Sequence, residues 1–130
     1  MRPELSVDKN RKGIMRLFSS AKNSIQGITY AYKYEKSFLL HTIFLIISII
    51  IGFFFKISFI EWLIIGGLNL LLIVIELLNT SVEATVDMIT TDFHPLAKIA
   101  KDCGSAATFI VIIATLIAEL IIFIPYIERL

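Results

Sequence analysis

The sequence predicts an all-α integral membrane protein with an N-terminal amphipathic interfacial helix and three transmembrane helices. Hydrophobic residues make up 57% of the chain, whereas a soluble domain has about 45–50%. Only 18% of the residues are charged, and the uncharged stretches between them are long. With 130 residues, the chain is expected to form one domain, residues 1–130.

The N-terminal segment combines a polar tail with an amphipathic helix. Residues 1–12 are polar and charged and lack the features of a cleaved signal peptide. Residues 13–33 are expected to form a helix that lies in the membrane interface, with basic side chains on its polar side. A helix packed on a protein partner would show the same pattern. Its apolar residues recur every three or four positions, at Ile14, Leu17, Phe18, Ala21, Ile25, Ile28 and Tyr32.

Three further segments are apolar enough to form helices that contain membrane spans. A span needs about 20 residues in an α-helix. The first segment, residues 38–55, carries no formal charge. The second, residues 59–89, is expected to continue past the bilayer into water. The third is residues 97–126, so that each chain crosses the membrane three times.

A few residues mark the ends of these segments. Glu61 and Trp62 have the character of a membrane–water interface, and Pro95 is well placed to open the last helix. The last segment is apolar except for its polar entry and Glu119. We interpret Glu119 as a side chain that reaches for the outer interface or makes an oligomer contact.

The distribution of basic residues predicts the orientation. Most of the twelve lysines and arginines lie in residues 1–36, and the first connection holds only Lys56. Because positive residues favour the cytoplasmic side, the N-terminus and the connection after Ile89 are expected in the cytoplasm. No basic patch is interleaved with aromatic residues, so nucleic acid is not an expected partner.

A polar stripe follows one face of the second segment. At about 100° per residue, its members share an arc about 80° wide. Like charges on one helix face are unfavourable unless a cation or another partner neutralises them. About 20 residues after Phe59 the chain reaches headgroup depth, so the stripe is expected to run from there into the cytosol. Its members are Glu76, Asn79, Glu83 and Asp87.

Such a stripe suits the transfer of a group between a lipid and a soluble substrate. Glu76, at headgroup depth, could take a proton from a lipid hydroxyl, and acids nearer water could hold Mg²⁺. Lys101 offers a positive charge for phosphate oxygens. Spacing alone leaves open a cation channel or carrier, and a structural subunit whose acids only join helices. The sequence contains neither a Walker loop nor a kinase-type glycine-rich loop.

The sequence that contains the stripe also resembles a known family signature. The stretch Glu76-Leu-Leu-Asn-Thr-Ser-Val-Glu83-Ala-Thr-Val-Asp87, then His94, then Ala100-Lys101-Asp102, closely resembles the signature of the prokaryotic diacylglycerol kinase family. The resemblance covers residues 14–127. It implies a homotrimeric kinase of the bacterial inner membrane, with active sites shared between subunits at the cytoplasmic face. It further implies Mg²⁺ and transfer of the ATP γ-phosphate to a lipid alcohol.

The resemblance assigns roles by matching positions. Glu76 corresponds to the general base for the lipid hydroxyl, and Glu35 and Glu83 to the carboxylates that hold Mg²⁺ with ATP. Ser105 matches a position beside the lipid substrate, and Arg16 one near both lipid and nucleotide. The other positions implied at the nucleotide are Asn23, Asn79, Asp87, Asp92, Phe93, His94, Lys101 and Asp102.

Two branches of the family differ in the lipid that they phosphorylate. One converts diacylglycerol to phosphatidic acid, and the other converts undecaprenol to its monophosphate. The stretch Asp102-Cys-Gly-Ser-Ala-Ala107 resembles the diacylglycerol branch, whereas Phe93-His-Pro-Leu-Ala-Lys98 and Glu61-Trp62 resemble the undecaprenol branch. We expect diacylglycerol as the acceptor, with undecaprenol as the alternative.

Overall fold

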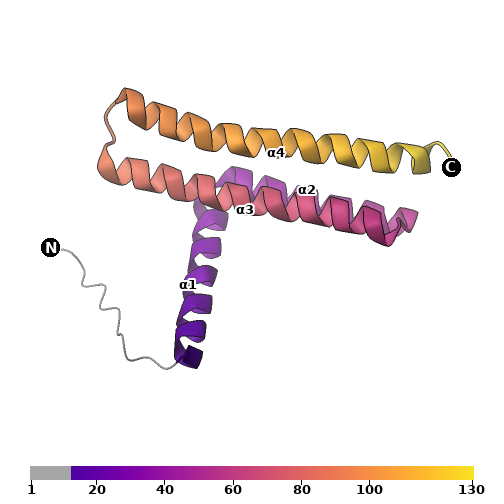
Figure 1. Ribbon diagram of the computed structural model, residues 1–130, viewed down its shortest axis with the longest axis horizontal. Coiled ribbons are helices and arrows are strands. Elements are labelled where there is room, and N and C mark those ends of the chain that lie inside the picture. The colour runs from indigo at the N-terminus through magenta and orange to yellow at the C-terminus, as the bar shows by residue number, and fades with distance from the viewer. Residues whose placement is uncertain (1–12) are drawn as a thin grey trace.

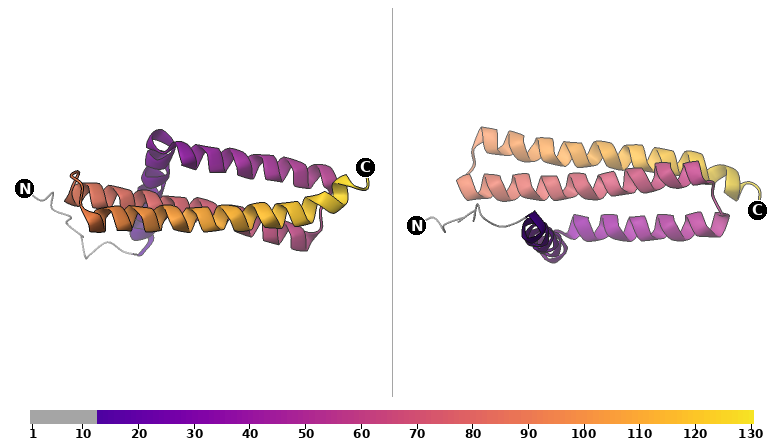
Figure 2. Two further views of the ribbon diagram at one scale, coloured as in Figure 1. Left: turned by 90° about the horizontal axis from the view of Figure 1, so that it is seen from above. Right: turned by 60° about the horizontal axis from the view of Figure 1, so that its bottom comes forward.

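The computed structural model describes residues 13–130, and the polar tail expected in residues 1–12 lies outside the described residues. Three helices, α2, α3 and α4, run side by side, and α1 meets this bundle at a steep angle at the start of α2 and extends away from it (Figure 1). Figure 2 shows the same arrangement from two other directions, with α1 beside the start of α2. The helix bounds are Gly13–Tyr34 for α1, Lys36–Phe55 for α2, Phe59–Ile89 for α3 and Pro95–Ile127 for α4.

The helices α2, α3 and α4, which run side by side, are each long and apolar enough to cross a membrane. Many of their large apolar side chains point outward, as at Leu70, Phe109 and Ile121, which are all more than half exposed. An outer surface covered with so many apolar side chains is unfavourable in water and favourable in hydrocarbon. The fold is therefore that of a multi-pass membrane protein.

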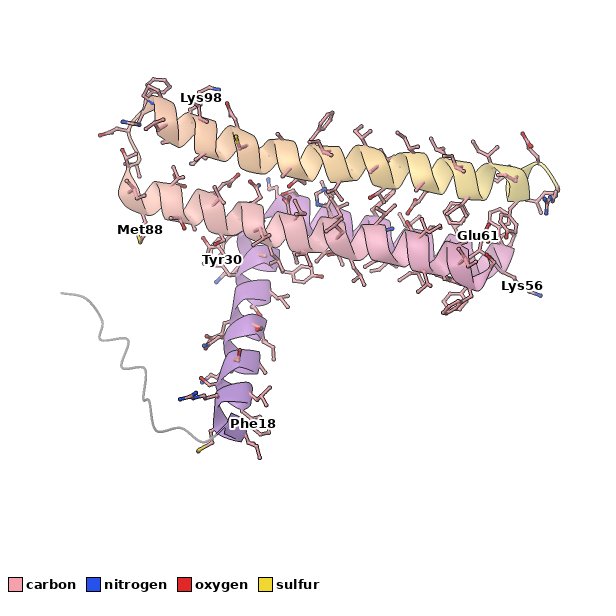
Figure 3. The ribbon with its side chains drawn as sticks, in the orientation of Figure 1. Phe18, Tyr30, Lys56, Glu61, Met88 and Lys98 are labelled. Atoms are coloured by element: carbon pink, nitrogen blue, oxygen red, sulfur yellow. The ribbon has the colours of Figure 1, made fainter. Side chains whose placement is uncertain are left out.

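The connection between α2 and α3 is stabilised by local hydrogen bonds. Lys56 adopts a left-handed conformation, with φ of 54°, and its N–H bonds back to carbonyls in the last turn of α2. Ser58 and Glu61 then form a reciprocal capping box at the start of α3. Tyr126 Oη, near the end of α4, donates to Glu61 at 2.8 Å. Lys56 and Glu61 both lie at this end of the bundle (Figure 3).

The turn between α3 and α4 forms the opposite end. The last helix begins at Pro95 rather than at Ala97, because proline fits the first turn of a helix, where its missing N–H leaves no bond unmade. His94 caps this helix, and its Nδ1 accepts from the Leu96 N–H at 3.2 Å. The imidazole of His94 therefore has a structural task in addition to any contact with a ligand.

A polar cluster joins the three helices inside the bundle. Glu119 of α4 is only 9% exposed, and its carboxylate accepts from Ser48 Oγ of α2 at 2.6 Å. It also accepts from Asn69 Nδ2 of α3 at 2.9 Å. The interpretation of Glu119 as reaching the outer interface is wrong, because the side chain finds two donors within its own chain.

We expect Glu119→Leu to lower the thermal unfolding temperature, because Ser48 and Asn69 would lose their shared acceptor in an apolar setting. Hydrogen bonds between membrane helices contribute roughly 0.6 to 1.7 kcal/mol each. Glu119→Gln keeps one acceptor oxygen and should be less destabilising. Thermal unfolding in detergent micelles, followed by circular dichroism, compares the two variants. A Glu119→Leu protein as stable as the parent would contradict this prediction.

Candidate active site

Glu76 lies at the junction of the three long helices. It is 3% exposed, and each of its carboxylate oxygens accepts a hydroxyl from a different helix. Ser37 Oγ of α2 donates to Oε1, and Thr108 Oγ1 of α4 donates to Oε2 at 3.0 Å. A carboxylate has about four acceptor positions. Two hydroxyl donors therefore fix the orientation of Glu76 and leave it able to accept from a ligand.

The sequence pattern did not indicate Ser37 or Thr108. Thr108 follows Ser105 by three positions, so the two hydroxyls lie on one face of α4, and this spacing could have pointed to it. Ser37 stands close to Glu35 in the sequence, but nothing in the chain relates it to Glu76. That contact depends on how α2 packs against α3, which a helical repeat does not encode.

Glu76 lines a cavity of about 440 Å³ that α2, α3 and α4 form together. The cavity unites the polar residues of α3 with hydroxyl groups of the other two helices. Four residues that the family resemblance implied lie here together: Glu76, Asn79, Glu83 and Ser105. The remaining lining residues are Ser37, His41, Thr108, Phe109 and Ile112.

Asn79 is held between Glu83 and Gly104. Its Nδ2 donates to Glu83 Oε1, one turn along α3, at 3.3 Å. Its Oδ1 is buried without a hydrogen-bond partner among the described residues, and a Cβ placed on Gly104 of α4 would lie 2.2 Å from it. The missing side chain at position 104 therefore lets α4 approach closely enough to fix the Asn79 carboxamide.

Glu35 lies just before α2 and is half-buried. It occupies the N-cap position of α2, but its side chain caps no helix N–H. Burial raises the pKa of the Glu35 carboxyl, and the negative charges of Glu83 and Glu76 raise it further. The three carboxylates thus share one electrostatic environment. Within residues 13–130, no group of three or more Asp, Glu, His or Cys side chains is placed to hold a metal ion.

The pKa of Glu35 should be measurably higher than that of an ordinary glutamate. Because neighbouring negative charge opposes ionisation, Glu83→Gln should move the pKa of Glu35 downward, toward the ordinary value. A pH titration of the ¹³C-labelled carboxyl groups by NMR, without metal or nucleotide, measures this change. Glu128→Gln, near the C-terminus, is the matched control and should leave Glu35 unchanged. An equal response to both substitutions would contradict the prediction.

A second cavity, of about 380 Å³, lies at the turn between α3 and α4, the end marked by Met88 and Lys98 in Figure 3. Lys101 Nζ donates to Asp87 Oδ1 at 2.5 Å, and Lys98 pairs with Asp102. The cavity brings together many residues that the resemblance implied at the nucleotide: Asp87, Asp92, Phe93, His94, Lys101 and Asp102.

The first helix does not contribute to these cavities. Of the described residues that line them, none belongs to α1, which carries Arg16 and Asn23. Asn23 borders a separate depression of about 480 Å³ along α1 itself. Phe18 lies at the end of α1 far from the bundle, and Tyr30 lies near it (Figure 3). A single chain therefore does not bring Arg16 or Asn23 to Glu76.

Comparison of the sequence with known proteins assigns the chain to a family. The sequence pattern described as "Prokaryotic diacylglycerol kinase" matches residues 22–123. The chain belongs to the prokaryotic diacylglycerol kinase family. The family match includes α2, α3, most of α4 and every residue that lines the two cavities. Arg16 lies before the matched residues.

Relatives of the chain carry two different names. It is 38% identical over 116 residues to the undecaprenol kinase of Bacillus subtilis (strain 168), which covers 89% of this chain and 94% of that protein. It is 40% identical over 98 residues to the diacylglycerol kinase of Haemophilus influenzae, covering 75% and 83%. It is 31% identical over 108 residues to the diacylglycerol kinase of Escherichia coli (strain K12), covering 83% and 88%.

Proposed function

We propose that this protein is an ATP- and Mg²⁺-dependent lipid kinase that phosphorylates diacylglycerol to phosphatidic acid. The observation that carries the proposal is the setting of Glu76, a buried carboxylate that two hydroxyls orient at the wall of a cavity. Membership of the prokaryotic diacylglycerol kinase family favours phosphoryl transfer over the channel, carrier and structural alternatives.

Glu76 acts as the general base in this proposal. The lipid hydroxyl enters the cavity and donates its hydrogen bond to the carboxylate, which Ser37 and Thr108 hold in place. As the hydroxyl oxygen bonds to the γ-phosphorus, its proton passes to Glu76. The bond between the γ-phosphorus and the β,γ-bridging oxygen breaks, and that oxygen leaves with ADP. The products are ADP and a lipid phosphate.

Glu35 and Glu83 are the side chains that would hold Mg²⁺. Their chemistry fits the ion, which prefers oxygen ligands and is commonly bound by one or two carboxylates together with substrate phosphates. The pKa of Glu35 is raised by burial and further by repulsion from Glu83 and Glu76, and a nearby cation would relieve that repulsion. When bound, the ion supplies positive charge to the phosphates. Asn79 supports the pair through its hydrogen bond to Glu83.

The second cavity is the proposed place for the nucleotide. Asp87, at its edge, follows Glu83 by four positions on α3, a rise of about 6 Å, so the two cavities follow one another along the same helix. Lys101 offers an ammonium group, and its present partner is the exposed carboxylate of Asp87. An exposed ion pair of this kind contributes little to stability, so phosphate oxygens can compete for Lys101.

The proposal also includes the orientation of the protein in the membrane and its assembly into a homotrimer. Ile14, Leu17 and Phe18 are all strongly exposed on α1, and α1 lies at a steep angle to the three long helices (Figure 1), as expected of a helix in the membrane interface. We place the N-terminus and both cavities on the cytoplasmic side of the bacterial inner membrane. In a homotrimer, α1 of one chain would supply Arg16 and Asn23 to a neighbouring site.

A kinase assay that offers diacylglycerol and undecaprenol side by side tests the proposal. Purified protein in mixed micelles with ATP and Mg²⁺ should form phosphatidic acid. Undecaprenol is the second candidate acceptor, favoured by the similarity to the Bacillus subtilis undecaprenol kinase. If only undecaprenyl phosphate forms, the protein is still a lipid kinase, but its acceptor is undecaprenol rather than diacylglycerol. The absence of any lipid phosphate would overturn the proposed function.

A further inference from the structure

A third cavity adjoins the cavity of Glu76 on the side that leads into the bundle. It has a volume of about 220 Å³, and His41 is its single polar lining residue. His41 and Ile112 line both cavities, so the two spaces meet at these side chains. The other residues of this apolar cavity are Leu40, Phe44, Leu72 and Leu116.

In the described part of the chain, one nitrogen of the His41 imidazole lacks a hydrogen-bond partner at this junction. Its Nδ1 is buried and has no hydrogen-bond partner within residues 13–130. A buried polar atom without a partner is unfavourable, and a ligand with a suitably placed oxygen would satisfy it. His41 follows Ser37 by four positions, a rise of about 6 Å along α2. It therefore lies on the same helix face as the hydroxyl that holds Glu76.

The two cavities place a carboxylate, then His41, then apolar side chains in a row, and a lipid alcohol has its hydroxyl, head and apolar chain in the same order. The reacting hydroxyl has to reach Glu76, while the chain attached to it has to return to hydrocarbon. The apolar cavity offers such a path, because Leu72 precedes Glu76 by one turn of α3 and therefore lies deeper in the span. The first atoms of the lipid would pass His41 on this path.

We propose that His41 is a positioning residue for the lipid acceptor. Its imidazole hydrogen-bonds an oxygen of the lipid head, and the first part of the lipid chain occupies the apolar cavity. This inference rests on the proposed function, because the ligand is the lipid alcohol. The oxygen is either the reacting hydroxyl, which diacylglycerol and undecaprenol share, or an ester carbonyl, which only diacylglycerol has.

NMR of the imidazole groups tests the contact without catalysis. The chain has two histidines, and His94 is an internal reference because its Nδ1 already caps α4. Protein labelled with ¹⁵N-histidine is titrated in micelles with each lipid alcohol, without ATP. We expect the His41 nitrogen signals to shift and those of His94 to stay constant. Unchanged His41 signals at saturating amounts of both lipids would overturn the proposal.

Kinetics of His41→Leu and His41→Gln give the second readout. We expect His41→Leu to raise the KM for the lipid about tenfold, in line with one lost hydrogen bond, and to leave the KM for ATP unchanged. His41→Gln retains a hydrogen-bonding group and should recover part of the loss. A defect with both lipids identifies the hydroxyl as the partner, and a defect with diacylglycerol alone identifies the ester.

Two results would separate this inference from its alternatives. If His41→Leu leaves the lipid KM unchanged, or raises the KM values for ATP and lipid equally while lowering the unfolding temperature, His41 is only structural and the proposal fails. If the parent protein phosphorylates neither lipid, the proposed function fails, and the NMR titration still decides whether His41 meets a lipid alcohol.

Discussion

Replacing Glu76 by glutamine is expected to lower kcat by about 10²- to 10⁴-fold, the usual contribution of a general base. Glutamine has nearly the same size, and its oxygen can still accept from Ser37 or Thr108, but it cannot take up the proton of the lipid hydroxyl. Binding of ATP with Mg²⁺ should remain measurable. Steady-state kinase assays in mixed micelles, together with calorimetric titration of the nucleotide, separate the two effects.

Glu119→Gln is the matched control, because within residues 13–130 Glu119 is the second buried carboxylate that joins all three long helices. It lines none of the cavities that hold the proposed substrates. Its replacement by glutamine should leave kcat within about threefold of the parent. If Glu76→Gln retained activity to the same degree as this control, Glu76 would not be the base.

Gly104→Ala is expected to lower kcat/KM by about 10- to 100-fold without unfolding the protein. The new Cβ would lie 2.2 Å from Asn79 Oδ1, so the Asn79 carboxamide has to turn away and lose its contact with Glu83. Displacements of about 1 Å in a catalytic arrangement can cost on the order of 100-fold in rate. Kinase assays and thermal unfolding of the same preparation measure both consequences.

Two comparisons make this prediction specific. Gly66→Ala is the matched control, because a Cβ at position 66 meets nothing within 4 Å, and its activity should match the parent. In an Asn79→Ala background the added Gly104→Ala change should have little further effect, because the clashing carboxamide is absent. A full additional loss in that background would show that Gly104 acts through something other than Asn79.

The polar stripe of α3 shows how much of the site a local repeat can reveal. Glu76, Asn79 and Glu83 recur at helical spacing, and the structure places all three at the same cavity. Their proximity is set by the backbone of one helix and needs no tertiary contact. The family resemblance added Glu35, whose pKa is raised by burial and, beyond that, by the nearby charges of Glu83 and Glu76.

The sequence by itself determined the three apolar helices, because length and hydropathy are properties of a segment and do not depend on its neighbours. It also determined which acids share a face of α3. Only the tertiary structure decided that Ser37 and Thr108 hold Glu76, that Gly104 fixes Asn79 and that Glu119 turns inward. These contacts join different helices. They depend on the rotation and offset of each helix against the next, which the period of a single helix does not specify.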